Sequence, residues 1–488
     1  MFWQESTDVT RPALVDAASG ATWSHAELRS KVRAVAAHLI RPQKSLVFCL
    51  CRNEPVTVIG YLAALEAGHA VMLLDSAVKA DVLADLLARY RPEIVLAPAA
   101  AAVPGVPAAP IAPATSGSAT LDDTYRPLDL ESGGVAWERS DAKPERVHPS
   151  LGILLPTSGS TGSPKFVRLS TAAVSSNAET ISTALAIVPT ERAVTSLPLH
   201  YSYGLSVLNS HLVSGACTVL TDRGPLDRTF WDLVRDLRCT SFAGVPYSYQ
   251  LLERIGFDTF DLPTLKTMTQ AGGKLDDARV ARFHALMTSR GGRFFVMYGQ
   301  TEATARIAVL PPDFLPRKLG SAGRALPNGR LEIEVDGVAA DRPGVTGEIV
   351  YSGPNVMMGY ATGRTDLSRG DDLGGRLNTG DLGHLDEDGC LYISGRTKRI
   401  SKVSGYRVDL DEVEARLAPN GPTAVVGTDE VIVVFCEYGD EDSLRELRME
   451  LAHALSLHYQ VILFRRVEAL PRTANGKLDY AALEVLAR

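Results

Sequence analysis

Apolar segments of strand length alternate with amphipathic helical segments along the first quarter of the chain. Residues 22–39 place apolar side chains at three- and four-residue spacing, and the apolar run SLVFCLC follows at residues 45–51. A second helical stretch at residues 54–68 leads to the apolar run AVMLLD at residues 70–75. Strands separated by helices are typical of a largely parallel sheet. The sequence therefore predicts a fold of the α/β class.

The pattern changes in the second half of the chain. From about residue 330, short strand-like runs such as RLEIEVDG and GEIVYSG are separated by Gly, Asp and Asn turns, which is typical of a β-rich subdomain. Nearer the C-terminus, the strand-like run VIVVFCEY precedes a helical stretch at residues 442–455, which indicates a small α+β module. Because 488 residues are too many for one simple core, we expect two or three domains.

Charge and composition argue against several classes of protein. The net charge is -7 and no stretch is dense in Lys and Arg, so we expect no nucleic-acid partner. The six cysteines match neither a disulfide framework nor a zinc site. The N-terminus has no basic segment followed by an apolar core, and no run reaches about 18 apolar residues. We therefore expect no membrane insertion and a cytoplasmic location.

A loop rich in small polar residues follows the strand-like run LGILL. The loop reads TSGSTGSPK over residues 157–165 and ends in Lys165. Small residues allow a tight turn in which backbone N–H groups and hydroxyls surround phosphate oxygens, while the ammonium group adds charge. The order differs from a Walker loop, because Lys165 follows Pro164 and no Ser or Thr comes directly after it. The loop indicates a polyphosphate site of another kind, although such a stretch alone is also typical of a surface turn.

Five segments in one order resemble the signatures of the adenylate-forming superfamily, which includes acyl-CoA synthetases, peptide-synthetase adenylation domains and luciferases. They are TSGSTGSPK (157–165), VMYGQTEAT (296–304), GEIVYSGPNVMMGY (347–360), a long segment over 378–414, and PRTANGKLDY (471–480). The resemblance implies a stand-alone AMP-dependent acyl or aryl acid ligase. It also implies a large N-terminal domain of sheets flanked by helices (1–397), which includes the β-rich subdomain at about 330–397. A small, mobile α+β domain would follow (398–488).

The resemblance implies a site for ATP and Mg²⁺. Tyr298 would stack on adenine, Asp381 would bind the ribose hydroxyls, and Arg396 would assist Asp381. Thr301 would contact the α-phosphate, and Glu302 would bind the magnesium ion, for which a carboxylate is a suitable hard ligand. Without the other motifs, these residues are also typical of a helix start and a β-turn. The remaining phosphate contacts would come from Thr157, Ser158, Gly159, Ser160, Thr161, Gly162 and Lys165.

The resemblance makes Lys477 the catalytic lysine. It would lie between the substrate carboxylate and the α-phosphate, where negative charge accumulates in the transition state. The ionised carboxylate is its own nucleophile, so no general base is required. Lys398 would be the hinge of a domain rotation that prepares thiol transfer. Gly405 would then admit the pantetheine arm, and Lys402 and Arg407 would serve its phosphate groups, although a solvated hairpin is the alternative for these two charges.

The identity of the acid is less constrained. In amino-acid-activating relatives an Asp anchors the α-amino group, and an ungapped alignment places Ser202 there, so an acid without an α-amine is favoured. His200 is shifted by one position from the family's aromatic-site histidine, and Tyr201 is the alternative. Small pocket residues leave room for a flat ring or an alkyl chain, so aromatic and fatty acids both remain open. The expected pocket residues are His200, Tyr201, Ser202, Gly244, Ala271, Gly272, Gly273 and Ala303.

Coenzyme A is the expected thiol acceptor. The phosphopantetheine of an acyl carrier protein is the alternative, because the segment after DEVEARL is short, and such a carrier would be a separate chain. Two other functions remain open, namely a non-catalytic acyl- or nucleotide-binding relative and a light-emitting oxygenase. The enzyme is favoured over the non-catalytic relative, which would not need six residues together: Lys165, Thr301, Glu302, Asp381, Arg396 and Lys477.

Overall fold

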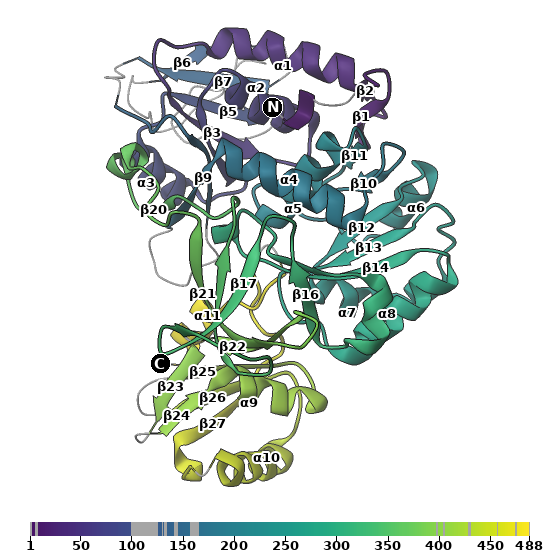
Figure 1. Cartoon of the computed structure of the whole chain (residues 1–488), viewed down its shortest axis with the longest axis vertical. Helices are drawn as coiled ribbons and strands as arrows, with labels where there is room; N and C mark the ends of the chain where they lie inside the picture. The colour runs from purple at the N-terminus through teal and green to yellow at the C-terminus, as the bar shows by residue number, and fades with distance from the viewer. Residues whose placement is uncertain are drawn as a thin grey trace, which may run out of the picture.

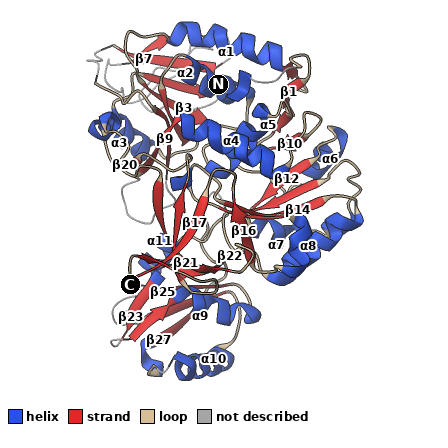
Figure 2. Ribbon diagram, in the orientation of Figure 1, coloured by secondary structure: helices blue, strands red, loops and turns tan. Residues whose placement is uncertain are grey.

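The described strands of this protein form two large sheets and two small ones (Figure 1). The computed structural model describes residues 2–4, 8–98, 125–128, 130, 134–140, 145–156, 165–396, 399–403, 406–427, 431–455, 457–473 and 476–487. Within these residues, helices lie against the faces of the sheets (Figure 2), and the predicted α/β class is confirmed.

The first sheet has eight strands and a parallel centre, as the alternating pattern predicts. The strands in spatial order are β20 (Gly359–Ala361), β9 (Phe166–Ser170), β8 (Leu151–Pro156), β4 (Ala70–Asp75), β3 (Leu46–Cys51), β5 (Ile94–Pro98), β7 (Gly134–Arg139) and β6 (Tyr125–Leu128). Helix α1 (His25–Leu39) precedes β3 and packs on α2, while α2 (Pro55–Glu66) and α3 (Ala80–Tyr90) connect β3 to β4 and β4 to β5. Every residue of β3 is buried, because a parallel central strand is covered on both faces. A capping box between Ser24 and Glu27 begins α1.

The second sheet has 14 strands and carries most of the candidate site. In spatial order these are β18 (Val338–Ala339), β17 (Arg330–Val335), β19 (Gly347–Ser352), β21 (Arg376–Leu385), β22 (Leu391–Arg396), β16 (Ser321–Ala325), β15 (Ala308–Leu310), β14 (Arg293–Tyr298), β13 (Thr267–Gln270), β12 (Ser241–Gly244), β10 (Arg192–Val194), β11 (Cys217–Leu220), β1 (Pro12–Asp16) and β2 (Thr22–Ser24). From β11 through β10, β12 and β13 to β14, neighbouring strands are parallel. From β15 through β16 and β22 to β21, neighbouring strands are antiparallel.

Five helices lie between β9 and β14 along the chain. They are α4 (Thr171–Leu185), α5 (Ser202–Val213), α6 (Arg228–Asp236), α7 (Pro246–Arg254) and α8 (Asp277–Ser289). Helices α4 and α5 pack together, with α4 against β8 and β9 of the first sheet and α5 against β10 and β11 of the second. This helix pair therefore joins the two sheets (Figure 1). Short 3-10 helices are η1 (Phe2–Gln4), η2 (Phe257–Thr259), η3 (Thr301–Ala303), η4 (Pro312–Arg317), η5 (Arg364–Ser368), η7 (Ala418–Asn420) and η8 (Tyr459–Val461).

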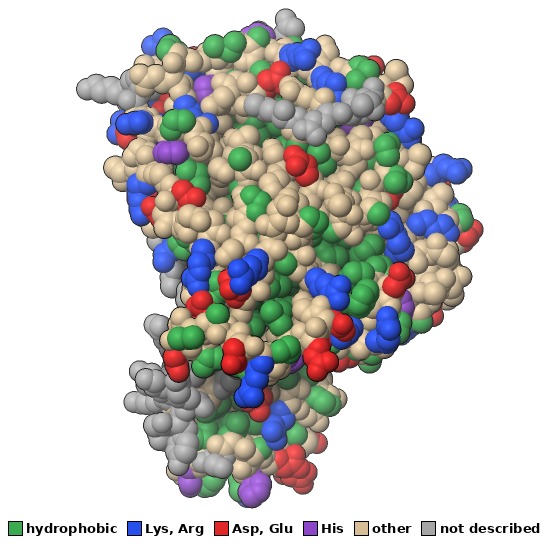
Figure 3. Space-filling view, viewed as in Figure 1, with side chains coloured by type: hydrophobic (Ala, Val, Ile, Leu, Met, Phe, Trp, Pro, Cys, Tyr) green, Lys and Arg blue, Asp and Glu red, His purple; other side chains and the backbone are tan. Residues whose placement is uncertain are grey.

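The C-terminal elements lie at the lower end of the molecule in Figure 1 and have apolar clusters of their own. They are β23 (Ile400–Val403), β24 (Tyr406–Asp409), α9 (Leu410–Leu417), β25 (Thr423–Gly427), β26 (Ile432–Cys436), α10 (Glu441–Leu455), β27 (Ile462–Arg466) and α11 (Tyr480–Ala487). Acidic and basic side chains are interspersed over the face of the whole molecule seen in Figure 3. Among the described helices, none is both long and apolar enough to cross a membrane.

The parallel half of the second sheet brings three loops to one edge. Strands β12, β13 and β14 are parallel neighbours in register and end at Gly244, Gln270 and Tyr298. The carboxyl ends of parallel strands share one edge of a sheet, where loops can form a binding site. Helix α5 begins beside them, because Gly204 in its first turn lets the helix approach the preceding loop. A Cβ at Gly204 would lie 2.2 Å from the carbonyl oxygen of Pro198.

We predict that Gly204→Ala destabilises the protein by about 1–3 kcal/mol, the usual cost of inserting an atom into a packed interior. The clash is with backbone, which cannot rotate away. The apparent melting temperature should fall relative to the wild type. Gly60→Ala in α2 is the matched control, because its Cβ would meet the movable Leu96 Cδ1 at 3.2 Å. Equal melting temperatures for the two variants would contradict the prediction.

Candidate active site

Tyr298, Asp381 and Arg396 form a hydrogen-bonded group where three strands come together. Tyr298 ends β14, and its hydroxyl donates to Asp381 Oδ2. Asp381 on β21 lies opposite Arg396 on β22 in the strand register, and Arg396 Nε donates to Asp381 Oδ1 at 2.9 Å. Burial, and next the Asp381 charge, raise the pKa of the Tyr298 phenol, so the phenol stays a neutral donor. The carboxylate is 5% exposed and is held at both oxygens.

The segment after β14 connects three parts of the chain. The hydroxyl oxygens of Thr301 and Ser202, the first residue of α5, lie 3.2 Å apart. Glu302 Oε1 accepts a hydrogen bond of 2.8 Å from the Tyr360 hydroxyl on β20. Lys165 Nζ lies 6.0 Å from the centroid of the same Tyr360 ring. A carboxylate, a hydroxyl and an ammonium group are thereby gathered beside the end of β14.

Lys477 reaches this region from the last part of the chain. It belongs to a hairpin in which Arg472 pairs with Leu478, and Gly476 adopts a left-handed φ of +75°. Lys477 Nζ lies 5.1 Å from the centroid of the Tyr201 ring. A Cβ at Gly272 would lie 2.7 Å from Tyr201 Oη and 3.5 Å from Lys477 Cε, so a side chain at Gly272 would intrude between them. The structure thus brings Lys477, Tyr201 and Gly272 together.

The charge state of Lys477 depends on its surroundings. Burial, and next the nearby Arg396 cation, lower the pKa of its ammonium group to about 8, while the Glu302 charge opposes both effects. Arg396 belongs to the Tyr298–Asp381–Arg396 group, and Glu302 belongs to the segment after β14. Lys477 therefore lies within electrostatic reach of both the Asp381–Arg396 pair and the Thr301–Glu302 segment.

The hairpin that carries Lys477 rests on the first turn of α7, which follows β12. The Arg472 guanidinium lies over the Tyr247 ring at 4.2 Å from its centroid, and Arg472 Nη1 donates to Gly476 O at 3.0 Å. A cation over an aromatic face is an attractive arrangement. Both residues lie in segments that the sequence pointed to, but neither was given a role of its own. Neither carries a local signal, because the contact joins segments more than two hundred positions apart in the chain.

Several sequence-predicted residues lie elsewhere or outside the described residues. His200 faces Asp75, with 3.9 Å between His200 Nε2 and Asp75 Oδ2, and it is Tyr201 that lies beside Lys477. Buried Ala271 and Ala303 follow β13 and β14 respectively, and Gly244 ends β12, while Gly273 lies close to Pro246. The residues that fall outside the described part, wholly or in their side chains, are Thr157, Ser158, Gly159, Ser160, Thr161, Gly162, Lys398, Lys402, Gly405 and Arg407.

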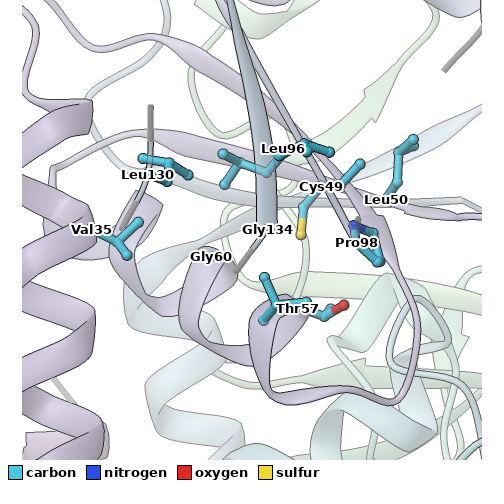
Figure 4. Close-up of a pocket in the computed structure, with 12 residues that line it drawn as sticks. Val35, Cys49, Leu50, Thr57, Gly60, Leu96, Pro98, Leu130 and Gly134 are labelled. Atoms are coloured by element: carbon cyan, nitrogen blue, oxygen red, sulfur yellow. The ribbon is translucent and has the colours of Figure 1, made fainter. Parts of the chain in front are cut away.

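A separate apolar cavity lies in the first sheet region, away from these residues. It is lined by Val35 of α1, Gly60 of α2, Cys49 of β3 and Leu96 of β5, among others (Figure 4). None of the candidate-site residues lines it. Its apolar lining offers no charged group for a nucleotide or an acid, so we assign it no role in the reaction.

Comparison with known proteins identifies the family to which this chain belongs. The family model described as AMP-binding enzyme matches residues 2–361. The chain belongs to the AMP-binding enzyme family. The predicted membership of the adenylate-forming superfamily, and the prediction of an AMP-forming enzyme, are therefore confirmed.

Two similar proteins are acid–CoA ligases by name. The chain is 32% identical over 377 residues to the indoleacetate–CoA ligase of Aromatoleum aromaticum, which covers 73% of this chain and 70% of that protein. It is 30% identical over 359 residues to the 2-succinylbenzoate–CoA ligase of Bacillus velezensis, covering 70% and 71%. The solved o-succinylbenzoate CoA synthetase of Bacillus subtilis superposes with a TM-score of 0.73 at 22% identity, over 99% of this chain and 97% of that one. This last likeness shows a shared fold.

We predict that kcat/KM of the enzyme's ATP-dependent reaction falls as the pH rises through about 8. A lowered pKa means that the Lys477 cation is present below about pH 8 and lost above it. Because kcat/KM reports groups of the free enzyme, it should follow this titration. The measurement is a pH profile of kcat/KM from pH 6 to 10, made alongside Lys477→Arg, whose guanidinium does not titrate there. A wild-type profile that stays level to pH 10 would contradict this assignment.

Proposed function

We propose that the protein activates a carboxylic acid with ATP to form an acyl-adenylate and pyrophosphate, and then transfers the acyl group to the thiol of coenzyme A. The observation that carries this proposal is the position of Lys477. Its ammonium lies against Tyr201, beside Gly272, and within electrostatic reach of Glu302 and Arg396. A cation placed between a nucleotide site and a pocket lined by small residues suits a reaction that joins two anions.

The nucleotide would bind along the Tyr298–Asp381–Arg396 group. Asp381 would accept hydrogen bonds from the two ribose hydroxyls, since a carboxylate has lone pairs beyond the two that Tyr298 and Arg396 already use. Tyr298 would contribute its ring face to adenine. Arg396 holds Asp381 from the exposed side, with its own side chain 64% exposed. The sugar would thereby direct the triphosphate toward Thr301.

The triphosphate would lie between Lys165, Thr301 and Glu302. Mg²⁺ in such sites is usually held by one or two carboxylates together with phosphate oxygens, and the Glu302 carboxylate beside the Thr301 hydroxyl fits that donor set. The ion would neutralise the charge that accumulates on the phosphates. Tyr360 orients Glu302 through a hydrogen bond of 2.8 Å and also lies under Lys165, so one tyrosine positions both charges. The loop over residues 157–162 would complete the phosphate contacts.

Lys477 would stabilise the transition state of the first step. One oxygen of the substrate carboxylate forms a bond to the α-phosphorus while the bond from that phosphorus to the pyrophosphate oxygen breaks. Negative charge crowds onto the α-phosphate oxygens, and the Lys477 ammonium offsets it in a partly dehydrated site. The residues align two reactants and need no general base, because the carboxylate is already ionised near neutral pH.

Thiol transfer would need a different arrangement of the C-terminal part. Because Lys477 lies beside Tyr201 and Gly272, residues 398–488 would rotate as a domain about Lys398, away from residues 1–397, before the thiol could approach. Gly405, Lys402 and Arg407 would then face the acyl-adenylate and the pantetheine arm. Coenzyme A is the favoured acceptor because two similar proteins are CoA ligases by name. An acyl carrier protein is the alternative acceptor.

The acid would be aromatic and lack an α-amine. The Ser202 hydroxyl lies against Thr301 and offers no negative charge to an ammonium group. Tyr201 and the side-chain-free Gly272 would bound the acyl pocket, and the two similar ligases act, by name, on indoleacetate and 2-succinylbenzoate, which both contain a flat ring. Fatty acids are the alternative class for the same pocket.

ATP–pyrophosphate exchange across aromatic, fatty and amino acids tests this function. We expect exchange with aromatic acids that lack an α-amine, and an acyl-CoA detected by mass when coenzyme A is added. Exchange without acyl-CoA would point to a carrier protein. No exchange with any acid on a broad panel would contradict the proposal and favour a non-catalytic role.

We predict that Lys477→Ala lowers the rate of acyl-adenylate formation by at least about 100- to 1000-fold, the usual loss when a positioned transition-state donor is removed. The fold should be unaffected, because Lys477 is on a hairpin outside the apolar clusters. The rate is measured by pyrophosphate exchange and the fold by thermal melting. Lys31→Ala, on the exposed face of α1, is the matched control. Near-normal exchange by Lys477→Ala would contradict the mechanism.

A further inference from the structure

Arg472 is a cation on the Lys477 hairpin that contacts an aromatic ring from a remote part of the chain. Its guanidinium lies 4.2 Å from the centroid of the Tyr247 ring, in the first turn of α7. Burial lowers the pKa of the Arg472 guanidinium, which shows that the cation is partly dehydrated. The attraction between a cation and a ring face is stronger under that condition. The contact therefore joins two segments that are far apart in the sequence.

The same ring supports the turn that precedes Lys477. Gly476 has φ +75°, and a Cβ there would lie 3.4 Å from Tyr247 Cδ1 and 3.5 Å from Val245 Cγ2, so the turn lies directly against both side chains. Arg472 Nη1 donates to Gly476 O at 3.0 Å. Tyr247 thus contacts the cation and the glycine next to Lys477.

Hydrogen bonds within the hairpin connect Arg472 to Lys477. Thr473 N donates to Lys477 O at 2.8 Å, and Gly476 N donates to Thr473 O at 2.9 Å. Arg472 also pairs with Leu478 across the hairpin. A displacement of Arg472 would therefore displace Lys477, because both residues belong to one hydrogen-bonded unit. The Tyr247 contact helps to fix the position of the Lys477 ammonium group.

Lys477 itself is not favoured in this position before anionic reactants bind. Burial, and next the Arg396 cation, lower its pKa to about 8, so the ammonium is less stable here than in water. A contact that stabilises the hairpin independently of the reactants would offset this cost. The contact between Arg472 and Tyr247 is of that kind, because it involves neither the triphosphate nor the acid.

We infer that Arg472 and Tyr247 are positioning residues for the first step, and that their contact holds the Lys477 hairpin beside the acyl pocket. Both residues act through Lys477. During thiol transfer the contact would separate, because Arg472 belongs to the part of the chain that would rotate and Tyr247 does not. The contact thus favours acyl-adenylate formation over the second step. This inference rests on the proposed two-step function and adds two residues to it.

Three variants test the first step. Tyr247→Leu removes the ring face, Arg472→Gln removes the cation, and Tyr247→Phe keeps the ring without its hydroxyl. ATP–pyrophosphate exchange is measured with the acid that gives the fastest exchange in the wild type. We expect Tyr247→Leu and Arg472→Gln to lower kcat by about 3- to 30-fold, the value of a cation over an aromatic ring, with KM for the acid unchanged. Tyr247→Phe should retain the wild-type rate.

The second step is measured separately, from the synthetic adenylate of the same acid. The thiol is pantetheine, the arm that coenzyme A and carrier proteins share. Tyr247→Leu and Arg472→Gln should form the thioester at least as fast as the wild type, because the contact has to separate before the thiol approaches. General damage to the protein would slow both steps. The double variant should lose no more exchange than Arg472→Gln alone, because the two residues form one contact.

Arg448→Gln is the matched control. The Arg448 guanidinium lies 5.2 Å from the centroid of the Tyr459 ring, so a contact of the same kind is present among the C-terminal elements. That contact joins α10 to η8 and does not reach α7. Both steps should therefore keep their wild-type rates in Arg448→Gln.

Backbone hydrogen exchange gives a readout that is independent of catalysis. The N–H groups of Thr473, Gly476 and Asp479 are hydrogen-bonded within the hairpin. In Tyr247→Leu they should exchange about 3- to 30-fold faster than in Tyr247→Phe, because a hairpin released from the ring opens more readily. The N–H groups of the buried strand β3 should exchange equally in the two variants.

The outcomes separate the inference from the function on which it rests. Wild-type exchange kinetics in Tyr247→Leu, or equal slowing of both steps, would overturn the inference and leave the proposed function in place. A change confined to KM for the acid would also overturn it, because Tyr247 would then belong to the acid pocket.

A failure of the proposed function would look different. Absence of exchange with every acid in the wild type would overturn that function, and hydrogen exchange would then decide whether the ring holds the hairpin. Equal exchange of the hairpin N–H groups in Tyr247→Leu and Tyr247→Phe would contradict the holding role. If Tyr247→Leu does not fold, Arg472→Gln decides, because Arg472 is only half-buried.

Discussion

The burial of the Lys477 ammonium is the constraint on which the rest of the site depends. Its pKa is lowered to about 8 by burial and by the Arg396 cation, and Glu302 is the acidic residue that opposes this shift. A cation in this position is stabilised when anions arrive. Under the proposed mechanism, the triphosphate and the substrate carboxylate supply those anions. Reactants would therefore hold the hairpin in place, and departure of pyrophosphate would weaken that hold before thiol transfer.

The sheet explains why such distant residues meet. Parallel strands β12, β13 and β14 end together, so the loops after Gly244, Gln270 and Tyr298 share one edge. Close approach at that edge depends on the absence of side chains. A Cβ at Gly299 would lie 1.9 Å from the Ala305 carbonyl oxygen, so the turn after β14 can fold back only with glycine there. Thr301 and Glu302 lie within that turn, and Arg306 follows it.

The sequence predicts the fold class and the chemistry of the family better than it predicts the contacts. Alternating strands and helices are local patterns, and the parallel pairing of β3 with β4 follows from them. The shift of the histidine by one position already pointed to Tyr201 as the alternative to His200, and the structure places Tyr201 beside Lys477. The signature motifs identify which site side chains are present. These motifs lie at the ends of strands and in loops.

Contacts between remote segments could not be predicted in the same way. Tyr360 orients Glu302 from 58 positions away, and the register of β20 on β9 decides where Tyr360 points. Arg306 follows a recognisable signature, yet nothing in the sequence indicates that it is buried, or that none of the carboxylates in the described part of the chain pairs with it. Its environment is created by α4, α5 and Asn355, which are set by tertiary packing.

The most direct test of acyl-adenylate formation follows the atoms of the carboxylate. With an acid that supports exchange and is labelled with ¹⁸O in its carboxylate, a single turnover followed by acyl transfer to coenzyme A should leave one labelled oxygen in AMP, because that oxygen bonds to the α-phosphorus. Mass spectrometry of the isolated AMP measures this. Label in AMP is the predicted result. Unlabelled AMP, or label recovered in inorganic phosphate together with ADP, would contradict the account.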